Sequence, residues 1–245
     1  MGNKPALIVQ DFGGEHNSDL TKSRTRLYRG KSWKTQRIIM ILPAADLVPA
    51  KCVLSWLNLQ YPPNNGIHRI LAQGMEVGDA YSTAIEGILN NPELSKWEYI
   101  LTLEHDNSPP YDGIMKLVEQ MEAHPEFSVC SGGYWTKGES GVFQAWGDIN
   151  DPVCNFRPVP PDPNGGLIEV HGTGMGFALW RISMFKDERL RRPWFKTQTV
   201  GGVSTQDLYF ASDARKYGYR FAVDCSCKVG HYDLEGKFGP PDFMW

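Results

Sequence analysis

The chain has 245 residues, of which 41% are hydrophobic and 22% charged, so it can bury the core of one large α/β domain. Its formal net charge of −3 argues against a partner held mainly by phosphate neutralisation, and the arginines near positions 24–37 and 189–192 are expected on two solvated surfaces. No apolar run approaches the roughly 20 residues of a membrane helix, and five cysteines without metal-ligand spacing favour a reducing compartment. We therefore expect a cytoplasmic protein without a membrane span.

Residues 1–36 are mostly polar and predict an arm outside the domain. Short apolar runs at residues 37–42, 67–73 and 99–103 then predict buried strands. Helical spacing of apolar residues predicts helices over residues 49–60, 79–90 and 112–123. This alternation is typical of an open parallel sheet with right-handed crossovers, which binds ligands at the carboxyl ends of its strands.

The second half of the chain has a less regular pattern. Further strands are predicted over residues 127–133, 167–170 and 221–224, and a hairpin over residues 142–151. A helix is predicted over residues 205–217, because Gly218 ends the pattern and two basic residues precede it. Together the elements predict a single domain over residues 37–245.

An acidic triplet, Glu104, His105 and Asp106, follows the strand predicted over residues 99–103. On an extended strand alternate side chains share a face, so the two carboxylates would be close enough to bind one divalent cation, Mn²⁺ or Mg²⁺. Carboxylates with this spacing are also common on protein surfaces. The position at a strand end is what favours a metal site.

Four segments in order resemble the family-2-like glycosyltransferases of the GT-A fold. They are Leu-Thr-Leu-Glu-His-Asp at 101–106, His-Gly-Thr-Gly-Met-Gly-Phe-Ala-Leu-Trp-Arg at 171–181, Thr-Gln-Asp-Leu-Tyr-Phe at 205–210 and Val-Gly-His at 229–231. The resemblance spans residues 37–232. It implies a single-domain GT-A-like α/β fold, with a mainly parallel open sheet flanked by helices and a small antiparallel acceptor-side part. Residues 37–125 would bind the nucleotide sugar and residues 126–245 the acceptor.

The resemblance implies a sugar transfer from a nucleoside-diphosphate sugar to an acceptor hydroxyl. Asp106 would bind the metal and the diphosphate, with Glu104 in place of the family's first Asp and His231 as a further metal ligand. Asp207 would be the catalytic base, although Ser204 precedes it with the spacing of a helix capping box. The expected donor-binding residues are Pro43, Ala44, Gln73, Asp79, His105 and Asp106. The expected acceptor-binding residues are Gly174, Trp180 and Gln206.

Several alternatives stay open at this point. The transfer could invert or retain the configuration of the sugar, since one fold hosts both outcomes. A nucleotidyltransferase is disfavoured because Pro43 and Ala44, rather than a glycine-rich phosphate loop, end the first strand. An inactive sugar- or nucleotide-binding relative is a third alternative, in which Glu104 and Gln206 mark the loss of activity. The acceptor could be a glycan, a protein, a metabolite or a modified nucleobase in DNA.

Overall fold

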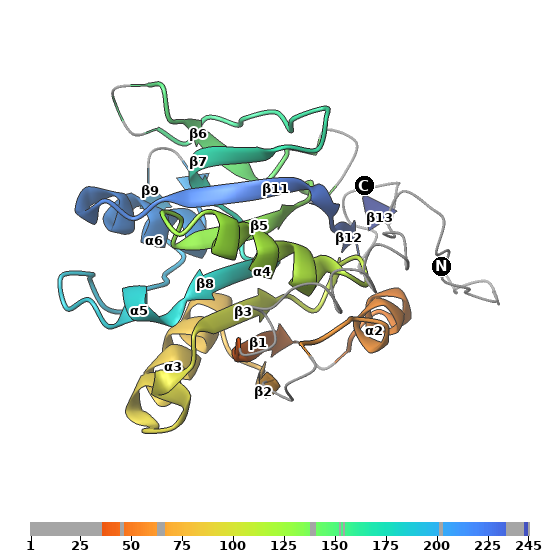
Figure 1. The fold of residues 1–245 in the computed structure, drawn as a ribbon, viewed down its shortest axis with the longest axis vertical. Coiled ribbons are helices and arrows are strands. Elements are labelled where there is room, and N and C mark those ends of the chain that lie inside the picture. Colours follow the sequence, from red (N-terminus) through yellow and green to blue (C-terminus); the bar gives the residue numbers. More distant parts are fainter. Residues whose placement is uncertain are drawn as a thin grey trace.

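The structure is a computed structural model that describes residues 36–44, 47–62, 67–137, 141–151, 153, 155–200, 203–233 and 243–244 (Figure 1). The arm expected over residues 1–36 lies outside these ranges, apart from its last residue. The largest feature is an eight-stranded sheet with the strand order β2-β1-β3-β8-β5-β11-β7-β6. Its strands are β1 (Ile38–Ala44), β2 (Ile67–Gln73), β3 (Tyr99–Leu103), β5 (Val129–Gly133), β6 (Ala145–Asp148), β7 (Leu167–Thr173), β8 (Phe177–Arg181) and β11 (Phe221–Lys228).

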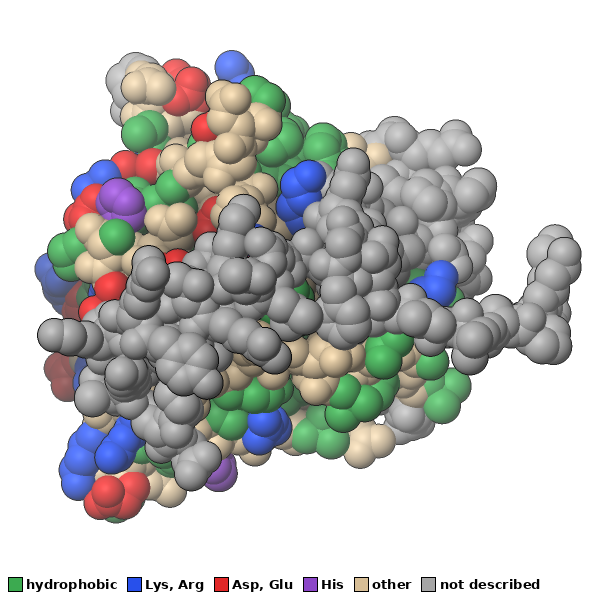
Figure 2. All heavy atoms as spheres, turned by 45° about the vertical axis from the view of Figure 1, so that its right-hand side comes forward, with side chains coloured by type: hydrophobic (Ala, Val, Ile, Leu, Met, Phe, Trp, Pro, Cys, Tyr) green, Lys and Arg blue, Asp and Glu red, His purple; other side chains and the backbone are tan. Residues whose placement is uncertain are grey.

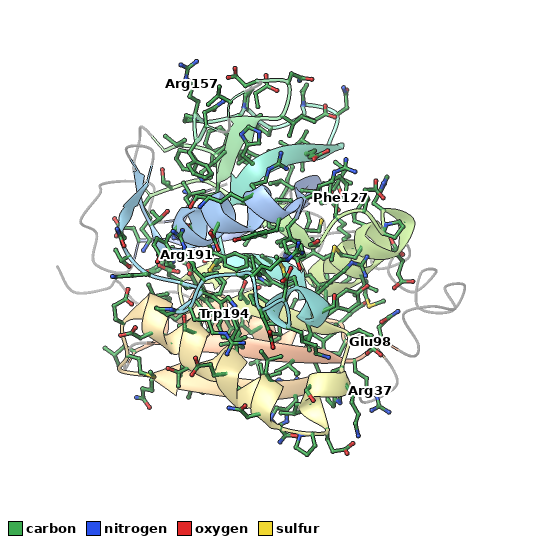
Figure 3. The ribbon with its side chains drawn as sticks, turned by 90° about the vertical axis from the view of Figure 1, so that its left-hand side faces the viewer. Arg37, Glu98, Phe127, Arg157, Arg191 and Trp194 are labelled. Atoms are coloured by element: carbon green, nitrogen blue, oxygen red, sulfur yellow. The ribbon has the colours of Figure 1, made fainter. Side chains whose placement is uncertain are left out.

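Helices cover both faces of this sheet. They are α2 (Ala50–Leu57), α3 (Val77–Asn90), α4 (Gly113–Ala123), α5 (Ile182–Phe185) and α6 (Gln206–Ala214), with short 3₁₀ helices η2 (Leu94–Lys96) and η3 (Arg215–Tyr217). Apolar residues of α3, α5 and α6 form one buried cluster with one face of the sheet, and those of α4 form a second cluster with the other face. In Figure 3, Trp194 of the first cluster lies between α3 and α6. The chain therefore forms an α/β/α arrangement.

The strand directions make the sheet mixed. Six strands, β1, β2, β3, β5, β6 and β11, run in one direction. Strand β1 pairs in parallel with β2 and β3, β5 pairs in parallel with β11, β8 runs antiparallel between β3 and β5, and β7 runs antiparallel between β11 and β6. Strand β7 pairs antiparallel with β11 over its first half and with β6 over its second half. The structure confirms that the chain forms a large, mixed sheet flanked by helices, which is a coarser statement than the single-domain GT-A-like fold that was expected. The antiparallel strands do come from the second half of the chain.

Some elements of the second half differ from expectation. Residues 142–151 form no hairpin of their own, because β6 pairs with β7. Two isolated bridges also join Phe143 to Trp135 and Trp146 of β6 to Pro158. Strand β8 was not expected, since its apolar residues directly follow a glycine-rich run. The helix expected over residues 205–217 is divided into α6 and η3, and both β7 and β11 are longer than expected.

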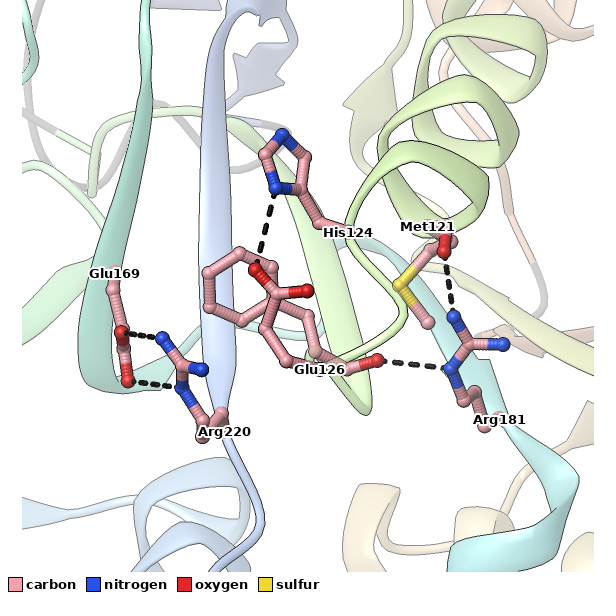
Figure 4. Close-up of polar contacts among 7 residues, drawn as sticks. Met121, His124, Glu126, Glu169, Arg181 and Arg220 are labelled. Carbon is pink, nitrogen blue, oxygen red and sulfur yellow. Dashed lines mark hydrogen bonds and ion pairs between the residues drawn. The ribbon is translucent and has the colours of Figure 1, made fainter.

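Two arginines join the elements at the edge of the sheet where β3 and β5 begin (Figure 4). Arg181 of β8 donates hydrogen bonds to the carbonyl oxygens of Met121 at 2.6 Å and Phe127 at 2.9 Å. Arg220 donates two hydrogen bonds to the carboxylate of Glu169. Because Arg181 pairs with the first residue of β3, this clamp lies at the opposite edge from the acidic triplet that follows β3. The edge that carries the acidic triplet therefore does not contain these arginine contacts.

Smaller sheets complete the fold. Strand β4 (Asn107–Ser108) pairs antiparallel with β12 (Gly230–Tyr232), which also pairs with β13 (Phe243–Met244), while β9 (Thr199–Val200) and β10 (Val203–Ser204) form a short hairpin before α6. Within the described part of the chain no helix has the length and apolar character needed to cross a membrane. The four described cysteines are buried free thiols.

Candidate functional site

A pocket of about 410 Å³ opens where β1 and β3 end, beside the start of α6. Its walls are formed by Pro43, Ala44, Gly74, Met75, Val77, Glu104, His105, Asp106 and Gln206. Six of the residues expected from sequence to bind metal, donor or acceptor therefore line one hollow, and they come from three separate segments of the chain. This is the location that open α/β sheets use for ligands.

The acidic triplet adopts a turn rather than an extended strand. The backbone N–H of Asn107 donates to the carbonyl oxygen of Glu104 at 3.1 Å, and β3 ends at Leu103. The two carboxylates consequently have different partners: the Tyr81 hydroxyl donates to Glu104 at 3.3 Å, whereas Asp106 contacts basic groups. The expectation that Glu104 and Asp106 share the face of an extended strand is wrong. The turn arises because the chain must enter β4 to pair with β12.

Asp106 is the best-connected carboxylate of the pocket. Its Oδ2 atom lies 2.5 Å from Nζ of Lys137 and 3.5 Å from Nε2 of His231. Burial alone would raise the pKa of Asp106, but hydrogen bonds and charges from His231 and Lys137 outweigh it and hold the pKa well below its ordinary value. Asp106 is therefore a carboxylate over the whole physiological pH range.

The pairing of β12 with β4 brings His231 to this carboxylate, and the backbone N–H of Tyr232 also donates to the Asp106 carbonyl at 2.7 Å. On its other side, Nδ1 of His231 lies 2.7 Å from the carbonyl oxygen of Trp135. Because a carbonyl oxygen only accepts, Nδ1 must carry a proton. When Nε2 also carries a proton, the ring is cationic and can donate to Asp106; when Nε2 lacks that proton, its lone pair faces Asp106. Histidines that bind metals are commonly fixed by such a hydrogen bond.

Asp106 and His231 together suit a divalent cation. Their Oδ2 and Nε2 atoms lie 3.5 Å apart, a separation that one cation can bridge. Cations at nucleotide sites often take only one or two protein ligands and complete their coordination with water and phosphate oxygens. Among the described residues, no group of three or more His, Cys, Asp or Glu side chains is arranged to hold a metal ion. Glu104 is therefore not placed with the other two as a third ligand.

Glu104 also differs from Asp106 in the direction of its pKa shift. Burial, followed by the negative charges of Asp106 and Asp207, raises the pKa of Glu104 to about 8. A protonated carboxyl is a weak ligand for a hard cation but can donate a hydrogen bond. Glu104 lines the pocket, so such a hydrogen bond could be made to a ligand bound there.

Asp207 lies in the first turn of α6 with 7% of its surface exposed. Its Oδ1 atom accepts the N–H of Leu208 at 2.8 Å, and burial raises its pKa. The N-cap of α6 is Thr205, whose side chain makes no capping hydrogen bond, so the helix does not begin at Ser204 as the expected capping box requires. Gln206 lines the pocket beside it. Asp207 thus sits directly behind the pocket wall, close enough for its charge to act on Glu104.

Two residues expected to bind the acceptor, Trp180 and Gly174, are instead explained by packing within the fold. Trp180 is 1% exposed, does not line the pocket, and donates through Nε1 to Thr102 at 3.2 Å. Its ring packs against the rings of Phe185, Phe195, Phe210 and Phe221. Stacking of Trp180 on an acceptor sugar is therefore not supported. Gly174 lies against the hydroxyl of Tyr134. A Cβ atom on residue 174 would overlap this hydroxyl, so the absence of a side chain at Gly174 permits the packing.

The donor side differs from expectation in detail. Gln73 and Asp79 do not line the pocket, and the residues between them, Gly74, Met75 and Val77, do. Asp79 is exposed in the first turn of α3, where its N–H donates to the side chain of Glu76. A second hollow of about 360 Å³ is lined mainly by apolar residues of β1 and α2. Hydrophobic side chains also gather on the surface in the lower part of Figure 2.

Lys137 was not expected from sequence to belong to the site. The available signal was its position four residues after β5, which ends at the same edge of the sheet as β3. Tyr81 and Tyr134 were also missed. Each is a buried tyrosine whose pKa is raised by burial and by the charge of Glu104.

No family model and no curated protein matches the chain. Among solved structures, one described as the crystal structure of A197 from STIV is similar, with a TM-score of 0.57. The two chains are 18% identical, and the match covers 81% of this chain and 86% of that one. At this identity the likeness shows a shared α/β fold. The chemistry must be argued from the pocket.

Proposed function

We propose that this protein transfers a sugar from a nucleoside-diphosphate sugar to an acceptor hydroxyl, with Mn²⁺ or Mg²⁺ at Asp106 and His231. The observation that carries the proposal is the convergence of Asp106, which contacts His231, with the end of β1 and the start of α6 on one pocket. A pocket of about 410 Å³ is within the usual range for small-molecule sites. The resemblance of four sequence segments to family-2-like glycosyltransferases supports the same assignment.

In the proposed reaction Asp207 is the general base. The acceptor oxygen attacks the anomeric carbon and forms the new C–O bond, while the bond from that carbon to the diphosphate oxygen breaks. The hydroxyl proton passes to the Asp207 carboxylate, and the nucleoside diphosphate leaves with the bonding electrons. This single displacement inverts the anomeric centre. A raised pKa favours proton acceptance by Asp207.

The remaining groups bind and orient the donor. The bound cation would neutralise the charge that develops on the diphosphate. Pro43 and Ala44 at the end of β1, with Gly74 and Met75, form the wall proposed to hold the nucleoside. Glu104, which keeps its proton near neutral pH, is positioned to donate to a donor hydroxyl or to a water molecule.

A binding experiment tests the donor site. Thermal unfolding is followed with a panel of nucleoside diphosphates and sugar nucleotides, with and without Mn²⁺. A ligand at about one hundred times its Kd stabilises the folded state by about 2.7 kcal/mol. We expect a Mn²⁺-dependent rise in Tm for one nucleotide, lost in Asp106→Asn and kept in the control Asp79→Asn, which alters an exposed carboxylate outside the pocket. The absence of a shift with every nucleotide would refute the donor site.

An activity experiment separates the alternatives. Asp207→Asn keeps the oxygen that accepts the Leu208 N–H but cannot take a proton, so we expect turnover to fall about 10²- to 10⁴-fold while nucleotide binding is kept. The anomeric configuration of the product distinguishes inversion from retention. Release of pyrophosphate instead of a nucleoside diphosphate would identify a nucleotidyltransferase. Nucleotide binding without transfer or hydrolysis would identify an inactive relative.

A further inference from the structure

The proposed donor poses an electrostatic problem for this pocket. Asp106 is a carboxylate, and a nucleoside diphosphate bound beside it adds further negative charge. Like charges packed at a partly buried site are unfavourable. One divalent cation at Asp106 offsets part of this charge. A second positive group beside the diphosphate would offset more of it.

Lys137 is positioned to be that group. It follows β5, its side chain is 21% exposed, and its ammonium lies 2.5 Å from Oδ2 of Asp106. Its positive charge also acts on Glu104, where it lowers the pKa against the effect of burial. The same segment supplies the Trp135 carbonyl that orients His231. The ammonium therefore lies beside the Asp106 carboxylate, at which the cation and the diphosphate are proposed to meet.

Lys137 and a divalent cation compete for the same atom. Oδ2 of Asp106 is the oxygen nearest to both Lys137 and His231, so a cation held between Asp106 and His231 must displace the ammonium. A lysine can make this movement because its charge is carried on a flexible four-carbon stem with three rotatable donors. An ammonium displaced from Asp106 by a short movement meets the phosphate oxygens bound to the same cation.

We propose that Lys137 is a diphosphate-binding residue, whose ammonium holds Asp106 in the metal-free protein and moves to the diphosphate when a divalent cation binds Asp106. This proposal rests on the function proposed above. It assigns two opposite effects on binding to the Lys137 side chain. Lys137 opposes binding of the free cation, and it favours binding of a diphosphate together with the cation.

Calorimetry on the full chain measures both effects, with Mn²⁺ alone and with inorganic pyrophosphate in saturating Mn²⁺ as probes. Lys137→Met removes the charge and keeps much of the length of the side chain. We expect it to bind Mn²⁺ about tenfold more tightly than the wild type and Mn²⁺–pyrophosphate about tenfold more weakly. Lys137→Arg keeps the charge, so its pyrophosphate affinity should stay within about threefold of the wild type. If Lys137→Met does not fold, Lys137→Gln replaces it in the same titrations.

The outcomes distinguish this proposal from the proposed function. Equal Mn²⁺ affinity in the wild type and Lys137→Met overturns the competition for Asp106. Equal pyrophosphate affinity in the two proteins overturns the diphosphate role and leaves Lys137 as a structural partner of Asp106, while the donor site stands. Failure of the wild type itself to bind pyrophosphate with Mn²⁺ overturns both the donor site and the role of Lys137.

Discussion

Replacement of Glu104 by glutamine should change how the stability of the protein depends on pH. The carboxyl is buried and has a pKa of about 8, compared with an ordinary value of 4.5. Between these values the folded protein binds a proton at Glu104 that the unfolded chain has released. The free energy of unfolding therefore falls as pH rises through this window, and the contribution of Glu104 is most favourable below the unfolded pKa.

The magnitude follows from the same shift. Each pH unit inside the window changes the free energy of unfolding by up to about 1.4 kcal/mol, so two units, from about pH 5.5 to about pH 7.5, lower it by up to about 3 kcal/mol through this one group. The glutamine introduced by Glu104→Gln cannot ionise, and its amide oxygen can still accept the hydrogen bond from Tyr81. The lowered pKa of Asp106 makes the free energy of unfolding depend on pH only below about pH 3.8, the ordinary pKa of this group, which lies outside this window.

The assay is urea unfolding of the wild type and Glu104→Gln at several pH values, with EDTA present to remove divalent cations. We expect the two proteins to have similar free energies of unfolding near pH 5.5, and the variant to become increasingly more stable than the wild type as pH increases. The difference between the two curves isolates Glu104 from the titratable groups that the two proteins share. Parallel curves across the window would show that Glu104 is already ionised in the folded protein and would refute the reasoning.

Three further changes test the packing around the site. Trp180→Ala should lower the free energy of unfolding by about 3 to 5 kcal/mol in urea titrations, because the ring is fully buried among phenylalanines, and an effect below about 1 kcal/mol would contradict this core position. Gly176→Ala should lower Tm, since its Cβ would overlap the buried amide of Asn107, and an unchanged Tm would show that the β7–β8 turn can move. Tyr81→Phe removes a hydrogen bond that lowers the pKa of Glu104, so the pH-dependent loss of stability should extend to higher pH; a shift to lower pH would contradict that contact.

The first half of the fold was predictable in part because β1 and β3 are buried on both faces. Such strands read as short apolar runs, and β1 and β3 were found within two residues of their ends from this feature. Strand β2 was found with the same ends from its apolar run, but it is an edge strand with only exposed and half-buried residues, so the expectation that it is buried is wrong. Strand β8 is equally buried, but the glycines before it favoured an interpretation as a motif. The partner change of β7 at Val170 has no periodic signal, because it depends on where β6 and β11 lie in space.

The candidate site was predictable only in part, for a related reason. Local pattern places Asp106 at a strand end, and the resemblance indicated His231, but their contact depends on the pairing of β4 with β12 across the chain. The same patterns could not tell that the Trp180 ring lies inward, since a tryptophan in an apolar run suits either a core or a binding surface. The partner of Asp106, Lys137, follows a strand with no motif around it.

The segment after β5 explains why the site depends on the whole fold. Tyr134 accepts the N–H of Gly176 and so fixes the turn before β8, Trp135 orients His231, and Lys137 pairs with Asp106. Three residues of this segment thus hold the proton of the histidine, the charge of the carboxylate and the turn before β8. A shift of one residue in this segment would move the Tyr134 and Lys137 side chains away from these partners, because successive side chains of extended backbone point to opposite sides. The length of the connection after β5 therefore determines whether Lys137 can reach Asp106.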